Sequence, residues 1–86
     1  MEKIRQNIDE IDQEILNLLK ERKELALKIG QIKQDENLLF KQPEREQTVF
    51  KDVEKSSKKL GLDPKFTEKL FKLIIKNSLE EQANQK

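Results

Sequence analysis

Apolar side chains recur in the amino-terminal part of the chain at alternating intervals of four and three residues. The positions that follow this rhythm are Ile4, Ile8, Ile11, Ile15, Leu18, Leu25, Ile29 and Ile32. Such spacing is typical of a helix that packs lengthwise against another helix. Arg22 occupies one position of this seam. A buried guanidinium is unfavourable unless an anion meets it, so Arg22 pairs with an internal carboxylate, extends to water or binds an anionic ligand.

Two glycines and two prolines divide the chain into three predicted helices. The first runs from about residue 2 to about 35, and Gly30 inside it costs about 1 kcal/mol relative to alanine. The second begins at Pro43 and ends near Gly61, which can adopt the left-handed cap. The third begins with Asp63 as N-cap and Pro64 in the first turn, and frays after about Gln82. The fold class is therefore all-α.

Two segments lie outside these helices. We expect the connection 36–42 to fold back on the core, because Leu38, Leu39 and Phe40 are too apolar for a free loop. The last three residues, 84–86, form a polar tail.

The length of the first helix bears on assembly. With 86 residues the chain makes one small domain, 1–86. A compact domain of this size is about 30 Å across, whereas the first helix is on the order of 50 Å long. It must protrude, and its seam needs a partner, so we expect a homodimer with the long helices paired. A monomeric hairpin or coiled coil is the alternative.

Composition removes several classes of chemistry. The chain has no cysteine and no histidine, which excludes disulfides, thiolate nucleophiles, imidazole bases and ordinary zinc sites. No metal and no cofactor is expected. Without a bilayer-spanning segment or a signal-peptide pattern, we expect a soluble, cytoplasmic chain without a membrane partner. Acids interleave with the lysines and the net charge is only +1, so no nucleic-acid partner is expected.

Each predicted helix has polar residues at the border of its apolar stripe. Lys33 follows Arg22 by about three turns and points to the same side. In the second helix the bordering residues are Arg45 and Glu46. Ser78 and Gln82 continue the apolar stripe of the third helix towards its end.

Each of these residues has an ordinary explanation as a helix-dipole partner, a hydroxyl bonded to the helix carbonyl, a fraying end or a long side chain reaching water. Together they describe a small cationic cavity with one carboxylate. Such a cavity suits a small anion that carries a hydroxyl.

Arg5 lies about 25 Å from Arg22 along the first helix, too far to share a small ligand within one chain. If two long helices pair antiparallel about a centre near residue 16, Arg5 of the partner subunit falls opposite the stretch between Arg22 and Lys33. A composite site then results. Otherwise Arg5 is an ordinary exposed residue near the terminus.

An ordered set of short motifs covers nearly the whole chain. The set comprises Arg5, IDEID at 8–12, LLKERKELA at 18–26, Ile29-Gly30, Ile32-Lys33, PERE at 43–46 and LIIKNS at 73–78 followed by Gln82. In this order the motifs resemble the all-helical chorismate mutases. The resemblance implies an intertwined homodimer of three-helix chains whose two active sites each use an arginine of the other subunit. It also implies the conversion of chorismate to prephenate in aromatic amino-acid biosynthesis, an intramolecular Claisen rearrangement without cofactor.

The resemblance further implies a role for each matching residue. Arg22 and Arg5 of the partner subunit would hold the side-chain carboxylate of chorismate, with Ser78 near the ring carboxylate. Lys33 and Gln82 would donate to the ether oxygen. The resemblance also implies that Glu46 holds the ring hydroxyl and that Arg45 organises that end of the pocket. Gln42, which stands where many relatives have aspartate, would line the pocket as well.

Three alternatives stay open on the sequence. An isochorismate-pyruvate lyase of the same fold uses a similar cationic pocket. The chain can also be a mutase domain of a longer enzyme or serve regulation. A helical interaction module without a small ligand would leave Arg22, Lys33 and Glu46 dispensable.

Overall fold

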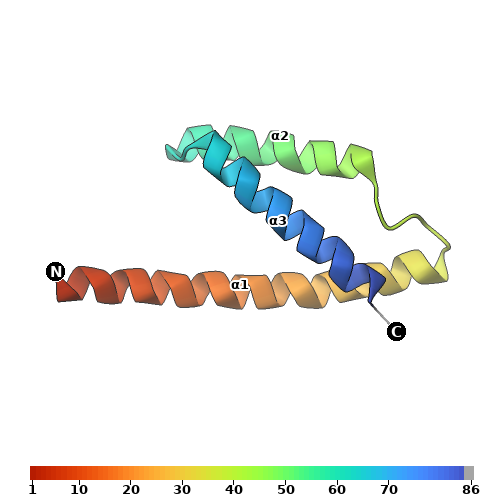
Figure 1. Ribbon diagram of the computed structural model, residues 1–86, viewed down its shortest axis with the longest axis horizontal. Helices are drawn as coiled ribbons and strands as arrows, with labels where there is room; N and C mark the ends of the chain where they lie inside the picture. Colours follow the sequence, from red (N-terminus) through yellow and green to blue (C-terminus); the bar gives the residue numbers. More distant parts are fainter. Residues whose placement is uncertain (85–86) are drawn as a thin grey trace.

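Three helices make up the chain in a computed structural model that describes residues 1–84 (Figure 1). They are α1 (Glu2–Asp35), α2 (Pro43–Leu60) and α3 (Pro64–Ala83). The described residues contain no strand, so the predicted all-α class is confirmed. The predicted helix boundaries are confirmed to within a residue or two. Of the predicted polar tail, residues 85 and 86 lie outside the described part.

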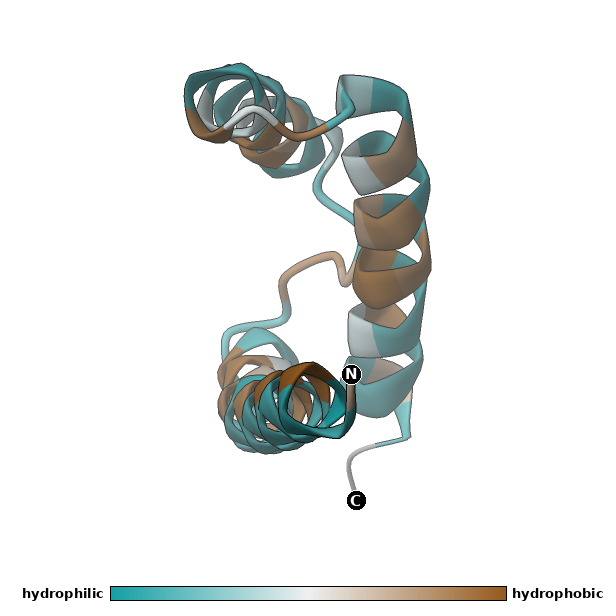
Figure 2. Cartoon of the chain, turned by 90° about the vertical axis from the view of Figure 1, so that its left-hand side faces the viewer, coloured by the Kyte–Doolittle hydropathy of each residue, from teal (hydrophilic) through white to brown (hydrophobic). Residues whose placement is uncertain are grey.

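α3 runs diagonally between the other two helices and contacts both (Figure 1). α1 and α2 lie on the same side of α3 without contacting each other within the described chain (Figure 2). The molecule measures 52 × 26 × 15 Å. The amino-terminal end of α1 projects beyond α2 and α3 (Figure 1), as its predicted length required.

Local sequence sets the boundaries of α2 and α3. Pro43 occupies the first turn of α2, where the helix leaves amide groups unpaired in any case. Gly61 closes α2 with a φ of 74°, a left-handed value that favours glycine. The Asp63 side chain then accepts from the Lys65 amide at 3.0 Å and caps α3.

The connection 36–42 differs from expectation. Leu39 is 80% exposed and Leu38 is also exposed, so the prediction that both fold back on the core was wrong. Only Phe40 is half-buried. The physical reason is local: Asn37 adopts a φ of 57°, and the Leu38 amide donates to the Lys33 carbonyl at 2.7 Å. This turn directs both leucines outward.

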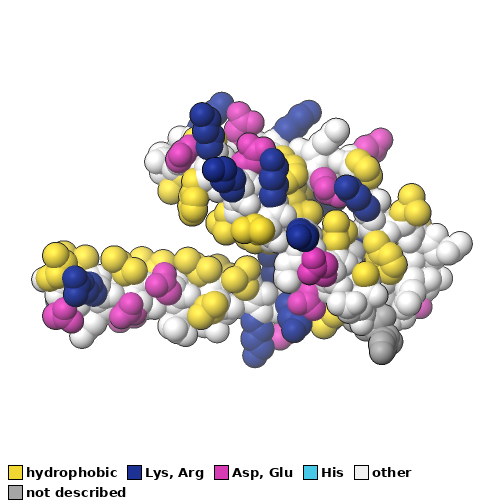
Figure 3. Space-filling model, in the orientation of Figure 1, with side chains coloured by type: hydrophobic (Ala, Val, Ile, Leu, Met, Phe, Trp, Pro, Cys, Tyr) yellow, Lys and Arg dark blue, Asp and Glu magenta, His cyan; other side chains and the backbone are white. Residues whose placement is uncertain are grey.

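The apolar seam of α1 is largely exposed in the single chain. Its first five members, Ile4, Ile8, Ile11, Ile15 and Leu18, are between 49% and 61% exposed. They form a row along the amino-terminal half of α1 (Figure 3). The residues that α1 does bury are Ala26, Gly30 and Lys33, where α3 crosses it. No helix of the described chain is long and apolar enough to cross a membrane.

A pair of hydroxyls, which the sequence did not predict, joins α2 to α3. Ser57 donates to the Val53 carbonyl at 2.6 Å, and its oxygen lies 2.7 Å from the Thr67 hydroxyl. The Thr67 hydroxyl also lies 3.2 Å from the Pro64 carbonyl, and either hydroxyl can be the donor between Ser57 and Thr67. Both side chains are buried, and this bond fixes the α2–α3 hairpin at its closed end.

Candidate active site

A cavity of about 270 Å³ lies between the three helices and the connection 36–42. Seven of the eight residues predicted from the sequence line it: Arg22, Lys33, Gln42, Arg45, Glu46, Ser78 and Gln82. The apolar part of the wall includes Ile29, Val49 and Ile75. The three helices thus bring together residues that lie up to sixty positions apart in the sequence.

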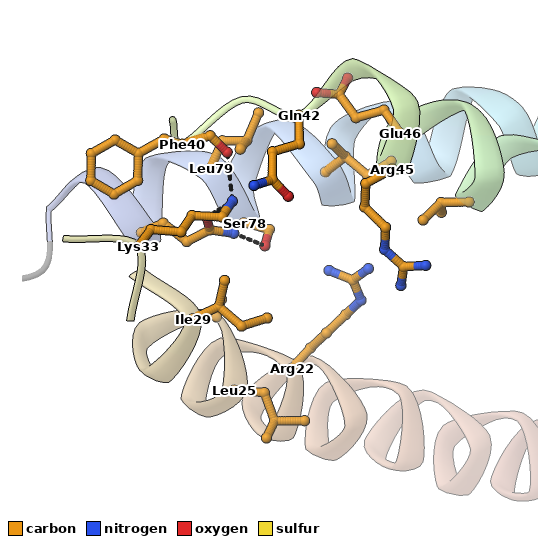
Figure 4. Close-up of a pocket in the computed structure, with 14 residues that line it drawn as sticks. Arg22, Leu25, Ile29, Lys33, Phe40, Gln42, Arg45, Glu46, Ser78 and Leu79 are labelled. Atoms are coloured by element: carbon orange, nitrogen blue, oxygen red, sulfur yellow. Dashed lines mark hydrogen bonds between the residues drawn. The ribbon is translucent and has the colours of Figure 1, made fainter. Parts of the chain in front are cut away.

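Lys33, Gln82 and Ser78 form one chain of hydrogen bonds at one end of the cavity (Figure 4). The Lys33 ammonium donates to the Phe40 carbonyl at 2.6 Å and to Gln82 Oε1 at 2.7 Å. Gln82 Nε2 in turn donates to Ser78 Oγ at 3.3 Å. Lys33 and Gln82 are only 8% and 6% exposed, so their partners determine where their polar atoms point.

Counting donors shows what these two side chains can still offer. An ammonium has three N–H groups and a side-chain amide has two. Lys33 uses two of its donors and Gln82 uses one of its own. One N–H of each therefore remains, on neighbouring residues of a buried wall. Two such donors can both donate a hydrogen bond to one acceptor atom of a bound molecule.

Burial affects the protonation of Lys33. Desolvation lowers the pKa of Lys33 below its ordinary value of 10.5, because the charged form loses hydration. The negative charge of Glu46 acts in the opposite direction and raises this pKa in part. The charges of the two residues thus interact across the cavity, although no direct hydrogen bond joins them among the described side chains.

Glu46 carries an unused acceptor. Its Oε2 atom is buried and has no hydrogen-bond partner in the described chain. A buried carboxylate oxygen without a partner is costly. A ligand that brings a hydroxyl donor to this position would satisfy it.

Two guanidinium groups face each other at the opposite end of the cavity. Arg22 from α1 and Arg45 from α2 extend towards one another (Figure 4). Neither forms an ion pair within the described residues, so an internal carboxylate does not meet Arg22 there. Two neighbouring cations repel each other, and an anion between them would relieve that repulsion.

Arg5 is the one predicted site residue that the single chain does not bring to the cavity. Its side chain is exposed on the projecting part of α1 and pairs with Glu2 at 3.5 Å. The Phe40 carbonyl, by contrast, belongs to the site and was not predicted. A backbone acceptor leaves no mark in residue type, so no sequence signal could have identified it.

The chemistry of this wall is that of anion binding and hydrogen-bond donation. No group of three or more carboxylates, the chain's remaining kind of metal ligand, is gathered for a metal ion in the described part. The cavity is instead lined by two guanidinium groups without ion pairs, by Lys33 and Gln82 with one spare donor each, and by Glu46, whose buried Oε2 has no partner. It suits a small molecule with negative charge at one end and a hydroxyl beside it.

The chain belongs to the chorismate mutase type II family, which matches residues 4–83. It is 35% identical to a protein named chorismate mutase from Methanocaldococcus jannaschii, over 87% of this chain and 76% of that protein. It is also similar to two proteins named bifunctional chorismate mutase/prephenate dehydratase. The one from Aquifex aeolicus is 43% identical over 70% of this chain, and the one from Escherichia coli K12 is 33% identical over 93%. The chain spans only 17% and 21% of these two longer relatives.

Proposed function

We propose that this chain, as a single mutase domain, converts chorismate to prephenate in the cavity between its helices. The reaction breaks the ether C–O bond and forms a C–C bond within one molecule. It needs no nucleophile and no cofactor, and negative charge grows on the ether oxygen as that bond breaks. The observation that carries the proposal is the buried pair of Lys33 and Gln82, each with a spare donor.

The two ends of the cavity fit the two ends of chorismate. Arg22 holds the side-chain carboxylate together with Arg5 of the partner subunit, and Ser78 lies near the ring carboxylate. Lys33 and Gln82 donate to the ether oxygen. These donors are already in place before the reaction, so they stabilise the developing charge without reorganising.

Glu46 accepts from the ring hydroxyl through its unpartnered oxygen. Arg45 orders that end of the cavity. Gln42 lines the same wall as a neutral amide. By holding the carboxylates and the hydroxyl at once, the cavity selects the folded conformer in which the bond-forming carbons meet.

A homodimer completes this site. The exposed row from Ile4 to Leu18 on the amino-terminal half of α1 is too long and continuous for a lone chain in water. A second α1, running antiparallel, would cover it and seal much of the space between α1 and α2, which do not touch. The pairing delivers Arg5 to the cavity of the other subunit, near Arg22.

Mixing two inactive variants tests the shared site. In a dimer of one Arg5→Ala chain and one Lys33→Ala chain, one site has both defects and the other has none. After unfolding and refolding an equal mixture, half of the dimers are mixed, so activity should return to about a quarter of the wild-type level. Mixing each variant with itself is the control. If the mixture contains mixed dimers and activity does not return, Arg5 does not act in the site of the other subunit.

The pH dependence of kcat/KM should report on Lys33. Only the charged ammonium donates all three N–H groups, and burial lowers the pKa of Lys33 from 10.5. We expect kcat/KM to fall on the alkaline side with an apparent pKa below 10.5, and this limb to disappear in Lys33→Arg, whatever activity remains. Lys33 loses its proton at a lower pH in the folded chain than in the unfolded chain. Its contribution to the free energy of unfolding therefore rises with pH between the lowered pKa and 10.5. An alkaline limb that persists in Lys33→Arg would assign it to another group.

Product analysis separates the mutase from the lyase of similar fold. The purified chain is incubated with chorismate and, separately, with isochorismate. We expect prephenate from the first and little pyruvate from the second. Salicylate and pyruvate from isochorismate without prephenate from chorismate would favour the lyase. No turnover of either by folded protein would favour the helical interaction module.

A further inference from the structure

Gly30 lies at the buried crossing of α1 and α3, yet its own conformation does not require glycine. It sits inside a regular helix, and Gly61 is the glycine with positive φ. In a helix interior, glycine is less favourable than alanine. The reason for glycine at this position must therefore lie in its surroundings.

The surroundings of Gly30 are the backbone of Gln82. A Cβ atom at position 30 would lie 2.8 Å from both the Cα and the carbonyl oxygen of Gln82. These are backbone atoms and cannot rotate away as a side chain can. To restore ordinary van der Waals distances, the end of α3 would have to move outward by roughly 0.5–1 Å.

The same residue that meets Gly30 through its backbone carries the amide that meets Lys33. Lys33 lies one turn after Gly30 on the same face of α1. The hydrogen bond from Lys33 Nζ to Gln82 Oε1, 2.7 Å long, thus lies next to the point where the α3 backbone packs on Gly30. The spacing of the two helices and the spacing of the two donors are set together.

We propose that Gly30 is a positioning residue for the reaction: by lacking a side chain it lets Gln82 approach Lys33 closely enough for both to donate to one substrate atom. This inference rests on the proposed mutase function. Gly30 touches no substrate and acts through Gln82. A displacement near 1 Å of a reacting or stabilising group can cost about a hundredfold in rate.

Gly30→Ala tests the proposal in the 86-residue chain. We expect kcat for chorismate to fall by roughly 10- to 100-fold. KM should change by less than about threefold, because Arg22 keeps its place on α1 and still binds the carboxylate. The matched control is Lys28→Ala, which introduces alanine on the exposed opposite face of α1 and should leave kcat within about twofold.

Two further variants separate positioning from general damage to the fold. If Gly30 acts through Gln82, then Gly30→Ala in a Gln82→Ala background costs less than about threefold more, since the group to be positioned is already gone. Gln82→Asn withdraws the amide from Lys33 without touching the helix contact, and should also lose about tenfold or more in kcat.

The results that overturn the proposal are distinct from those that overturn the function. Normal kcat in folded Gly30→Ala, or losses that multiply in the double variant, removes the positioning role. If Gly30→Ala does not fold, Gln82→Asn decides: unchanged turnover overturns the proposal and a tenfold loss supports it. Absence of prephenate with the wild type instead contradicts the mutase function itself.

Discussion

Lys33→Ala lowers the turnover of chorismate by at least about two orders of magnitude, as expected for the loss of a preorganised donor to developing charge. The effect should appear mainly in kcat, because the ether oxygen becomes a strong acceptor only as its bond breaks. The measurement is the initial rate of chorismate consumption over a range of substrate concentrations. Lys28→Ala, which removes an exposed lysine of the same helix, is the matched control and should behave as wild type.

A structural consequence of Lys33→Ala has to be measured alongside. The change leaves the Phe40 carbonyl and Gln82 Oε1 without their donor, which costs on the order of 1–3 kcal/mol for buried groups. Thermal unfolding followed by circular dichroism and the mass of the assembly therefore accompany the kinetics. Normal turnover in a folded Lys33→Ala dimer would mean that the hydrogen-bonded wall is not where the ether oxygen reacts.

Arg22→Ala also lowers turnover by at least about two orders of magnitude, through a different step. Arg22 forms no ion pair in the described chain and extends into the cavity, so its charge is available to the substrate carboxylate. Loss of this contact should raise KM, because the carboxylate is already held in the ground state. It should also lower kcat, because the same contact helps to hold the folded conformer from which the reaction proceeds. Steady-state kinetics measures both constants.

The structure also predicts what Arg22→Ala leaves intact. Because Arg22 interrupts an apolar seam and faces Arg45 without a carboxylate between them, the fold and the proposed dimer should persist or gain stability. Lys20→Ala, an exposed change elsewhere on α1, serves as the control for lost positive charge. Normal kcat and KM in Arg22→Ala would mean that Arg22 is only a polar residue at the edge of the seam and does not bind the substrate.

Much of the fold can be read from a few residues. Pro43, Gly61 and Pro64 mark the helix boundaries because each has a backbone preference that holds in any context. The exposed leucines of the connection could not be predicted. Their direction depends on the left-handed turn at Asn37 and on amide bonding to the carboxyl-terminal end of α1, and these are not encoded in hydropathy.

The candidate site was predictable where helical periodicity controls it. Lys33 shares a side of α1 with Arg22, and Gln82 follows Ser78 by one turn, so spacing alone places each pair on a face. How the faces meet is a tertiary matter. The closeness of Gln82 to Gly30 and the use of the Phe40 carbonyl by Lys33 depend on how the helices cross and how the connection turns. Arg5 shows the remaining limit, since its proposed place lies in a second chain.

The most direct test is prephenate formation by the purified wild-type chain, measured beside Lys33→Ala at equal concentration of folded dimer. We predict saturable conversion of chorismate to prephenate by the wild type, far above the uncatalysed rate and reduced at least about a hundredfold in the variant. Conversion at the uncatalysed rate by folded, dimeric wild-type protein would contradict the proposed activity.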